Sequence, residues 1–371
     1  IYTLSLHDAL PIYQPKNQWD HQSRNDSEQR NLRRRNIKPG IWGTNGDDRK
    51  MKERKLFGMT KELFLRRYGI TFIFIAMVIL LSIVSPVFRT WRNWVSILQQ
   101  VSTNGILALG MVFVITAGGI DLSIGSMLAL TSVVVGETLI ATNSIPLAIF
   151  AAIVICSIFG FINGILVARF DLFPFVVTLA TQLVIRGMAY IVSGGQSKVI
   201  MHPNYRDIGL GKIGGIIPFS VLILLGVATA SYILLHQTTF GRYIYAVGGN
   251  KDAARASGVN VEKTIIQSYI LMGGCSAISG VILASRINAS QPNIGMGYET
   301  DAIAACVIGG TSFAGGVSTI PGAMIGIFMI GIIYNGMNLL QVQSYWQTVI
   351  KGLLILLAVL LDMYLNKKRS K

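Results

Sequence analysis

Long apolar stretches alternate with short polar segments along the chain from residue 69 to residue 365. A helix that crosses a membrane needs about 20 predominantly apolar residues, and most of the stretches are of that order. The predicted spans are 69–88, 97–118, 122–139, 145–167, 174–192, 216–235, 264–285, 320–340 and 345–365, with a shorter glycine-rich piece at 301–316. The pattern therefore predicts an all-helical polytopic membrane protein of about ten segments, some of them broken or short.

A polar break at residues 118–125 separates the second and third stretches and contains Asp121 and Ser123. In hydrocarbon every backbone N–H and C=O needs a partner, and a carboxylate at the centre of a span costs about 2.5–3.5 kcal/mol. The break is therefore expected either in a turn at the membrane surface or in a broken helix that lines a water-filled cavity. In both cases a solute or a partner can reach Asp121.

A second aspartate, Asp301, lies beside the other glycine-rich segment in the second half of the chain. The two aspartates are candidates for equivalent positions in an internal repeat of the kind that transporters contain. The alternative is that each of them caps the helix that follows it, with Ser123 sharing the capping at the first site. Lys351 and Asp362, near the ends of the last span, are expected to extend to the membrane interfaces.

The composition supports a membrane protein, because 52% of the residues are hydrophobic and 13% are charged, whereas soluble domains carry about 25% charged residues. The net charge of +15 does not require nucleic-acid binding, since basic residues gather before and between the spans, as in cytoplasmic loops. Residues 1–67 are predicted to form a basic, largely disordered cytoplasmic segment, residues 68–366 the transmembrane domain and residues 367–371 a basic cytoplasmic tail. The opening residues resemble translated cloning sequence, and Met51 is the expected start, which leaves open whether residues 1–50 are native.

Residues 236–263 form a long hydrophilic segment whose basic residues place it in the cytoplasm. Its glycine and asparagine residues suit turns around a short helix at Ala253 and Ala254, which would form a knob small enough to enter a groove. The alternative is a positively charged loop that is merely solvated. The chain has no G-x-x-x-x-G-K-[ST] phosphate loop, so ATP hydrolysis would have to come from another chain.

Polar side chains also occur within the spans, and Thr178, Gln182 and Arg186 share one face of the fifth. Because polar groups that face lipid are costly, this face should point to the interior, where it lines a solute path or bonds to another helix. The candidate residues of a translocation path are Asp121, Ser123, Asn163, Thr178, Gln182, Arg186, Asp301, Thr311 and Asn335. The span at 264–285 is dense in small residues, which allow helices to approach closely.

Three motifs carry a resemblance to a known family: GGIDLSIGSMLAL at 118–130, FGRYIYAVGGNKDAARASGVNV at 240–261 and GYETDAIAACVIGGTSFAGG at 297–316. In this order and at these separations the chain resembles the membrane-spanning permease of ribose-type and galactoside-type ATP-binding-cassette importers, over about residues 72–362. The resemblance implies a type II importer-like fold in the bacterial inner membrane, with both termini cytoplasmic. The motifs are shared by permeases for several sugars and do not specify which monosaccharide is carried.

The resemblance also implies partners. They are a second copy of the permease, an ATPase that binds ATP and Mg²⁺, and an extracytoplasmic receptor that delivers the sugar, while this chain itself binds no cofactor. In the family the loop at 241–260 corresponds to the segment that docks into a cleft of the ATPase. The coupling residues that follow from this correspondence are Gly248, Gly249, Asn250, Ala253, Ala254, Ser257 and Gly258. A neutral, hydroxyl-rich sugar would suit a path of weak hydroxyl and amide contacts.

Two other classes of function remain as alternatives. A secondary transporter coupled to an ion gradient would need ionisable residues deep in the spans, and Glu137 and Arg186 are the candidates outside the broken motifs. A membrane enzyme has less support, because the spans contain no Ser–His pair or acidic cluster at catalytic spacing. The expectation is therefore a transport subunit that is not itself an enzyme.

Overall fold

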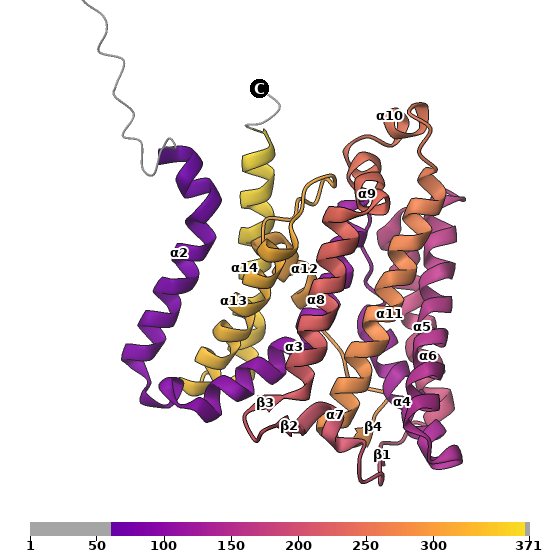
Figure 1. Cartoon of the computed structure of the whole chain (residues 1–371), viewed down its shortest axis with the longest axis vertical. Helices are drawn as coiled ribbons and strands as arrows, with labels where there is room; N and C mark the ends of the chain where they lie inside the picture. The colour runs from indigo at the N-terminus through magenta and orange to yellow at the C-terminus, as the bar shows by residue number, and fades with distance from the viewer. Residues whose placement is uncertain (1–60, 368–371) are drawn as a thin grey trace, which may run out of the picture. The chain divides into compact units, whose positions relative to one another are not determined.

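The structure is a computed structural model of the chain (Figure 1). It describes residues 61–367. The predicted N-terminal segment up to residue 60, and residues 368–371 of the predicted tail, lie outside the described residues.

Ten of the described helices correspond in order to the ten predicted segments. They are α2 (Lys61–Val84), α3 (Trp91–Thr116), α4 (Ile124–Thr142), α5 (Ile145–Ala168), α6 (Pro174–Ser193), α8 (Phe219–Gln237), α11 (Val261–Ile287), α12 (Tyr298–Ile308), α13 (Ile320–Leu339) and α14 (Ser344–Lys367). Within the described residues, seven helices are long and apolar enough to cross a membrane. With 11 residues, α12 is too short to cross on its own. The predicted all-helical polytopic membrane fold is confirmed.

The connections contain the remaining short elements. They are the 3₁₀ turn η1 (Pro86–Arg89), α7 (Arg206–Leu210), α9 (Thr239–Gly249), α10 (Lys251–Ala256), β1 (Lys198–Val199), β2 (Lys212–Ile213), β3 (Ile217–Pro218) and β4 (Ala289–Ser290). The strands form two antiparallel pairs, β1 with β4 and β2 with β3. The pairing of β1 with β4 joins the connection after α6 to the connection after α11.

The first helix begins earlier than the sequence predicts. α2 starts at Lys61 rather than near residue 69, so residues 61–67 are helical, whereas the sequence predicts disorder there. Lys, Glu, Leu and Arg are good helix formers, which explains how a helix extends beyond the apolar run that marks a span. Hydrophobicity therefore located the span, and helix propensity set where the helix begins.

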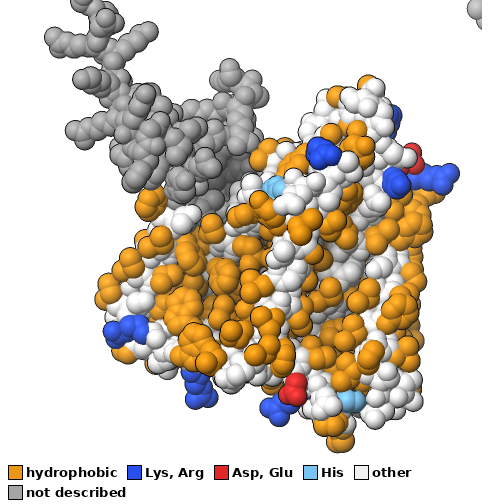
Figure 2. All heavy atoms as spheres, viewed as in Figure 1, with side chains coloured by type: hydrophobic (Ala, Val, Ile, Leu, Met, Phe, Trp, Pro, Cys, Tyr) orange, Lys and Arg blue, Asp and Glu red, His pale blue; other side chains and the backbone are white. Residues whose placement is uncertain are grey.

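α11 packs against α3, α4 and α5 and is central to the helical unit. The predicted close approach through small residues is present: a side chain at Gly273 would overlap the carbonyl of Cys156 on α5. In contrast, α5 and α6 expose large apolar side chains such as Phe150 and Leu183. Figure 2 shows apolar side chains over most of the viewed face, as expected for helices that face lipid tails.

Several of the short connecting elements lie at two opposite ends of the helical unit. Figure 1 shows α9 and α10 at the same end as the beginning of α2 and the end of α14, while α7 and the four strands lie at the other end. The sequence predicts this grouping, because it assigns the basic lead, the loop at 236–263 and the C-terminal tail to one side of the membrane.

Candidate functional site

The break between α3 and α4 is held together by a buried set of hydrogen bonds. Asp121 Oδ1 accepts the backbone N–H of Ser123 at 2.9 Å and its hydroxyl at 2.6 Å. Asn163 of α5 donates from Nδ2 to the Ser123 hydroxyl at 3.0 Å. We call Asp121, Ser123 and Asn163 the break cluster, and the three residues are 0% exposed. The cluster leaves Asp121 Oδ2 and Asn163 Oδ1 without a hydrogen-bond partner within the described part of the chain.

The carbonyl of Ile120 ties the same break to two further helices. Tyr269 of α11 donates its hydroxyl to this carbonyl at 3.1 Å. The hydroxyl of Thr178 lies 3.4 Å from it and donates at 2.8 Å to Pro174 within α6. Tyr269 is not among the residues predicted from the sequence, where its only signal is a phenol within a span of small residues.

These contacts argue against a surface turn, and the 0% exposure of Asp121 contradicts the expectation that a solute or partner can reach it. Asn163 and Tyr269 lie inside their helices, away from the helix ends, so the break is in the interior of the helical unit and not in a surface turn. Non-helical backbone is tolerated at such a depth when protein groups satisfy it. Asp121 is also not the N-cap of α4: Ser123 occupies that position, and Asp121 accepts its N–H from two residues upstream.

Asp301 has a different environment. It lies in the first turn of α12, whose N-cap is Gly297, so the alternative in which Asp301 is the cap of this helix is wrong. Its Oδ1 forms an ion pair with Lys351 Nζ of α14 at 2.6 Å and accepts the Tyr334 hydroxyl of α13 at 2.6 Å. Lys351 therefore points inward, which corrects its predicted extension to the interface. The side chain of Asp362 lies outside the described residues.

The other predicted path residues are distributed over separate contacts. Arg186 donates to the carbonyls of Pro292 and Ile294 at 2.8 and 2.6 Å, and so anchors the irregular segment before α12. Gln182, one turn earlier on α6, is half-buried. Thr178 therefore contacts the backbone beside the break cluster. Arg186, on the same helix, contacts a different segment, the one before α12.

Asn335 and Thr311 lie apart from the break cluster as well. Asn335 exchanges two amide hydrogen bonds with Asn93 of α3, at 2.8 and 3.0 Å. Thr311, in the connection after α12, is buried, and its hydroxyl has no hydrogen-bond partner among the described residues. Asn335 therefore joins α13 to the beginning of α3, a contact that holds two helices together.

The connection between α8 and α11 contains the short helix that the sequence predicts. Asn250 caps α10 by accepting the N–H of Ala253 at 2.9 Å, and Ser257 donates its hydroxyl to the Ala253 carbonyl at 2.9 Å. The Ala253 side chain is exposed, whereas Ala254 is buried against the rest of the connection. Ala253 is thus available to a partner, while Ala254 supports the helix from inside.

Glu137 also has a partner that the sequence does not indicate. Its Oε1 forms an ion pair with Lys198 Nζ of β1 at 2.5 Å, and both side chains are partly exposed. This pair lies where α4 approaches the strands, at the end of the helical unit opposite α10 (Figure 1). Glu137 is therefore a charged group near the end of a helix.

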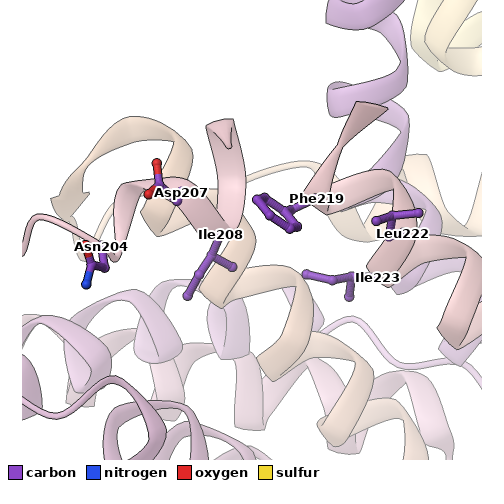
Figure 3. Close-up of a pocket in the computed structure, with 6 residues that line it drawn as sticks. All are labelled: Asn204, Asp207, Ile208, Phe219, Leu222 and Ile223. Carbon is purple, nitrogen blue, oxygen red and sulfur yellow. The ribbon is translucent and has the colours of Figure 1, made fainter. Parts of the chain in front are cut away.

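A groove of about 480 Å³ lies between α7 and α8. Figure 3 shows its lining. Asn204, Asp207 and Ile208 come from the α7 side, and Phe219, Leu222 and Ile223 from α8. The groove is at the end opposite α10, and none of the predicted path or coupling residues lines it.

Comparison with known proteins identifies the family. The family described as "branched-chain amino acid transport system / permease component" matches residues 93–359. The chain belongs to this family of permeases. The match includes the break cluster, the connection with α10 and the segment around Asp301, so it covers all three motifs. The permease is a multi-pass membrane protein and a transport subunit, as the sequence predicts.

Several curated relatives resemble the permease over most of their length. It is 44% identical to the ribose import permease of Bacillus subtilis over 288 residues, which are 77% of this chain and 89% of the relative. It is 43% identical to the ribose import permease of Escherichia coli K12 over 302 residues, 80% and 93% of the two chains. An L-arabinose permease of Azospirillum brasilense is 36% identical over 305 residues, 82% and 90% of the two chains. No solved structure matches the permease significantly.

Proposed function

We propose that the permease is the membrane-spanning subunit of an ATP-driven importer of a monosaccharide. The observation that carries the proposal is the 44% identity to a ribose import permease over 89% of that relative. The description of the family refers to branched-chain amino acids, but the relatives that match nearly end to end are named for ribose and arabinose. A pentose is the first candidate substrate, and galactose is the second.

The proposal includes three partners. A second copy of the permease completes the translocation path, an extracytoplasmic receptor delivers the sugar, and an ATPase binds ATP and Mg²⁺. The exposed side of α10 supports docking to the ATPase, because Ala253 offers a small surface on a capped helix. This assigns α9, α10 and both termini to the cytoplasmic side of the inner membrane, in agreement with the basic residues at that end.

The burial of each polar residue indicates whether it supports the fold or can contact the sugar. The break cluster is fully buried and bonded internally, so it maintains the shape of the break. Gln182 and Arg186 are half-buried on the adjoining face of α6, and they are the first candidates for contact with the sugar. Few and weak polar contacts allow a neutral solute to leave as well as to enter.

A secondary transporter coupled to an ion gradient has less support. Its relay candidates both have partners, since Glu137 pairs with Lys198 and Arg186 binds two carbonyls. A relay needs groups that exchange protons or ions during the cycle. The transport experiment described next can still detect this function, as uptake driven by an ion gradient.

The test is reconstitution of the permease in lipid vesicles with the ATPase and receptor encoded beside its gene. Uptake and ATPase activity are measured with ribose, arabinose, galactose and leucine. We expect one of the sugars to stimulate hydrolysis and to accumulate, and Ala253→Arg to abolish the stimulation. If leucine alone stimulates hydrolysis, the substrate is an amino acid and the proposed sugar substrate is wrong. Accumulation under an ion gradient without ATP would overturn the importer.

A further inference from the structure

Three segments that are distant in sequence meet at the end of α9. We call their contact residues, Thr116, Tyr245, Gly248, Gly316 and Ser318, the three-way junction. Gly316 donates its N–H to the Thr116 carbonyl at 2.9 Å, and Thr116 Oγ1 lies 2.7 Å from Ser318 Oγ. Tyr245 donates its hydroxyl to the Ser318 carbonyl at 2.9 Å. The junction therefore joins the end of α3, the helix α9 and the connection between α12 and α13.

Gly248 is the position at which the three backbones come closest. A side chain there would overlap the carbonyl of Thr116 and the backbone nitrogen of Gly316. The contact at this point is between main chains, which have no rotamers to absorb a displacement. Gly226 of α8 offers a matched comparison, because a side chain there would meet nothing within 4 Å.

The Tyr245 hydroxyl adds a hydrogen bond to Ser318 that is kept near neutral pH. Burial raises the pKa of Tyr245, and its hydrogen bond with Ser318 offsets part of that effect. The phenol thus remains protonated and can donate its proton to the Ser318 carbonyl near neutral pH. A second contact at 3.4 Å joins the Tyr245 hydroxyl to Ser318 Oγ, so α9 is held to this connection by two atoms of one residue.

The position of the three-way junction would allow a movement of α10 to reach other segments of the permease. Thr116 is the last residue of α3, directly before the break that contains Asp121. Ser318 lies just before α13, in the connection that follows α12 and its Asp301. α9 continues through Asn250 into α10. One contact point thus joins α10 to both interrupted segments of the permease.

We propose that Thr116, Tyr245, Gly248 and Ser318 are positioning residues, which move α3 and the connection after α12 together with α10 as one rigid body. The inference deepens the proposed function and rests on it, since it supposes that an ATPase displaces α10. Packed protein interiors transmit strain and switch between discrete arrangements, so a contact without slack passes a small shift onward. The two breaks would then respond to the ATPase simultaneously.

The first experiment compares Gly248→Ala with Gly226→Ala in the reconstituted complex. The ratio of receptor-stimulated to basal ATPase activity should fall at least about fivefold in Gly248→Ala, the low end of usual coupling energies, while the ATPase still copurifies. The ratio should be unchanged in Gly226→Ala. If Gly248→Ala does not assemble, Tyr245→Phe removes only the hydroxyl and should lower the ratio in the same direction. An unchanged ratio in the assembled variant would overturn the inference.

The second experiment asks whether the junction stays closed during transport. In Thr116→Cys/Ser318→Cys the two sulfurs replace hydroxyl oxygens that are 2.7 Å apart, a placement close to the roughly 2 Å of a disulfide. If the junction moves as one body, the oxidised complex should transport as well as the same complex after reduction. If oxidation stops uptake and reduction restores it, the junction opens in the cycle and the inference is wrong. The single cysteine variants control for the substitutions.

The unmodified complex separates this inference from the proposed function. If it shows no receptor-stimulated hydrolysis and no uptake, the proposed function itself fails. If it transports normally and Gly248→Ala does too, only the three-way junction is rejected. Both readings come from the same preparation, because the variants and the unmodified permease are assembled in parallel.

Discussion

Asp301 and Lys351 form an ion pair at 2.6 Å between α12 and α14, and the exposed fractions of their side chains are 9% and 21%. Lys351 also donates to the Gly297 carbonyl at 2.7 Å. The carboxylate lies in the first turn of α12, where the positive end of the helix dipole favours it. One lysine thus attaches α14 to the beginning of the short helix α12.

Replacing the lysine should destabilise the permease strongly. Lys351→Met leaves a buried carboxylate whose remaining partner is the Tyr334 hydroxyl, and breaking a buried pair costs about 3–5 kcal/mol. We expect a lower midpoint of thermal unfolding in detergent, and partial recovery in Asp301→Asn/Lys351→Met. Arg255→Ala removes the exposed pair with Asp252 and should change the midpoint little. An unchanged midpoint in Lys351→Met would show that the pair is not stabilising.

Two substitutions of Asp121 should have different effects on folding. Asp121→Asn keeps an oxygen that accepts the N–H of Ser123, whereas Asp121→Ala leaves that buried donor unsatisfied, at a cost of about 1–3 kcal/mol. Thermal unfolding of the purified permease should rank the alanine variant below the asparagine variant. Sugar uptake by the asparagine variant then shows whether transport needs the negative charge of Asp121. Equal unfolding of both variants and the unmodified chain would contradict the role of the break cluster.

Adjacent alanines in α10 should respond in opposite ways to a bulky charge. Ala254 is 4% exposed, so Ala254→Arg must bury a guanidinium group or displace α10. Ala253→Arg places the same group in solvent. We expect Ala254→Arg to reduce the yield of monodisperse permease in size-exclusion chromatography, and Ala253→Arg to behave as the unmodified chain. Normal folding of Ala254→Arg would show that α10 is packed differently.

Two adjacent glycines of α11 offer a test of helix packing. A side chain at Gly273 would overlap the Cys156 carbonyl, whereas at Gly274 the nearest atom is 4.0 Å away. Gly273→Ala should therefore lower the free energy of unfolding by about 1–3 kcal/mol, as overpacking does. Gly274→Ala should leave it nearly unchanged. Thermal unfolding of the two variants side by side measures the difference, and equal midpoints would refute the close approach of α5 and α11.

The order and nature of the membrane helices could be predicted because the information is local. The predicted span 174–192 corresponds to α6, Pro174–Ser193: Pro174 suits the first turn of a helix, and Gly194 ends the helix with a positive φ of 63°. The beginning of α2 was missed because its first residues are charged, and a hydrophobic run does not mark them. The short helix α10 was found because its turn residues flank an alanine-rich stretch.

The candidate site was only partly predictable. The sequence indicates that Asp121 and Asp301 need compensation inside the membrane, because burial of a carboxylate is costly wherever it occurs. It does not indicate that Asp121 is compensated through Ser123 and Asn163. Nor does it indicate that Asp301 is compensated by Lys351. Local rules suggested helix capping for both aspartates. Asp121 instead accepts bonds from the nearby Ser123, which the distant Asn163 holds in place, and Asp301 pairs with the distant Lys351.

The sequence by itself determined the membrane class, the span order, the two interruptions and the short helix between α9 and α11, since each depends on hydrophobicity and turn chemistry within a few neighbouring residues. The tertiary structure alone decided which polar groups meet. Thr116, Gly248 and Gly316 are separated by long stretches of chain, yet their main chains come together at one point. The physical reason is that helix packing sets which distant backbones approach each other, and packing depends on side chains from several helices at once.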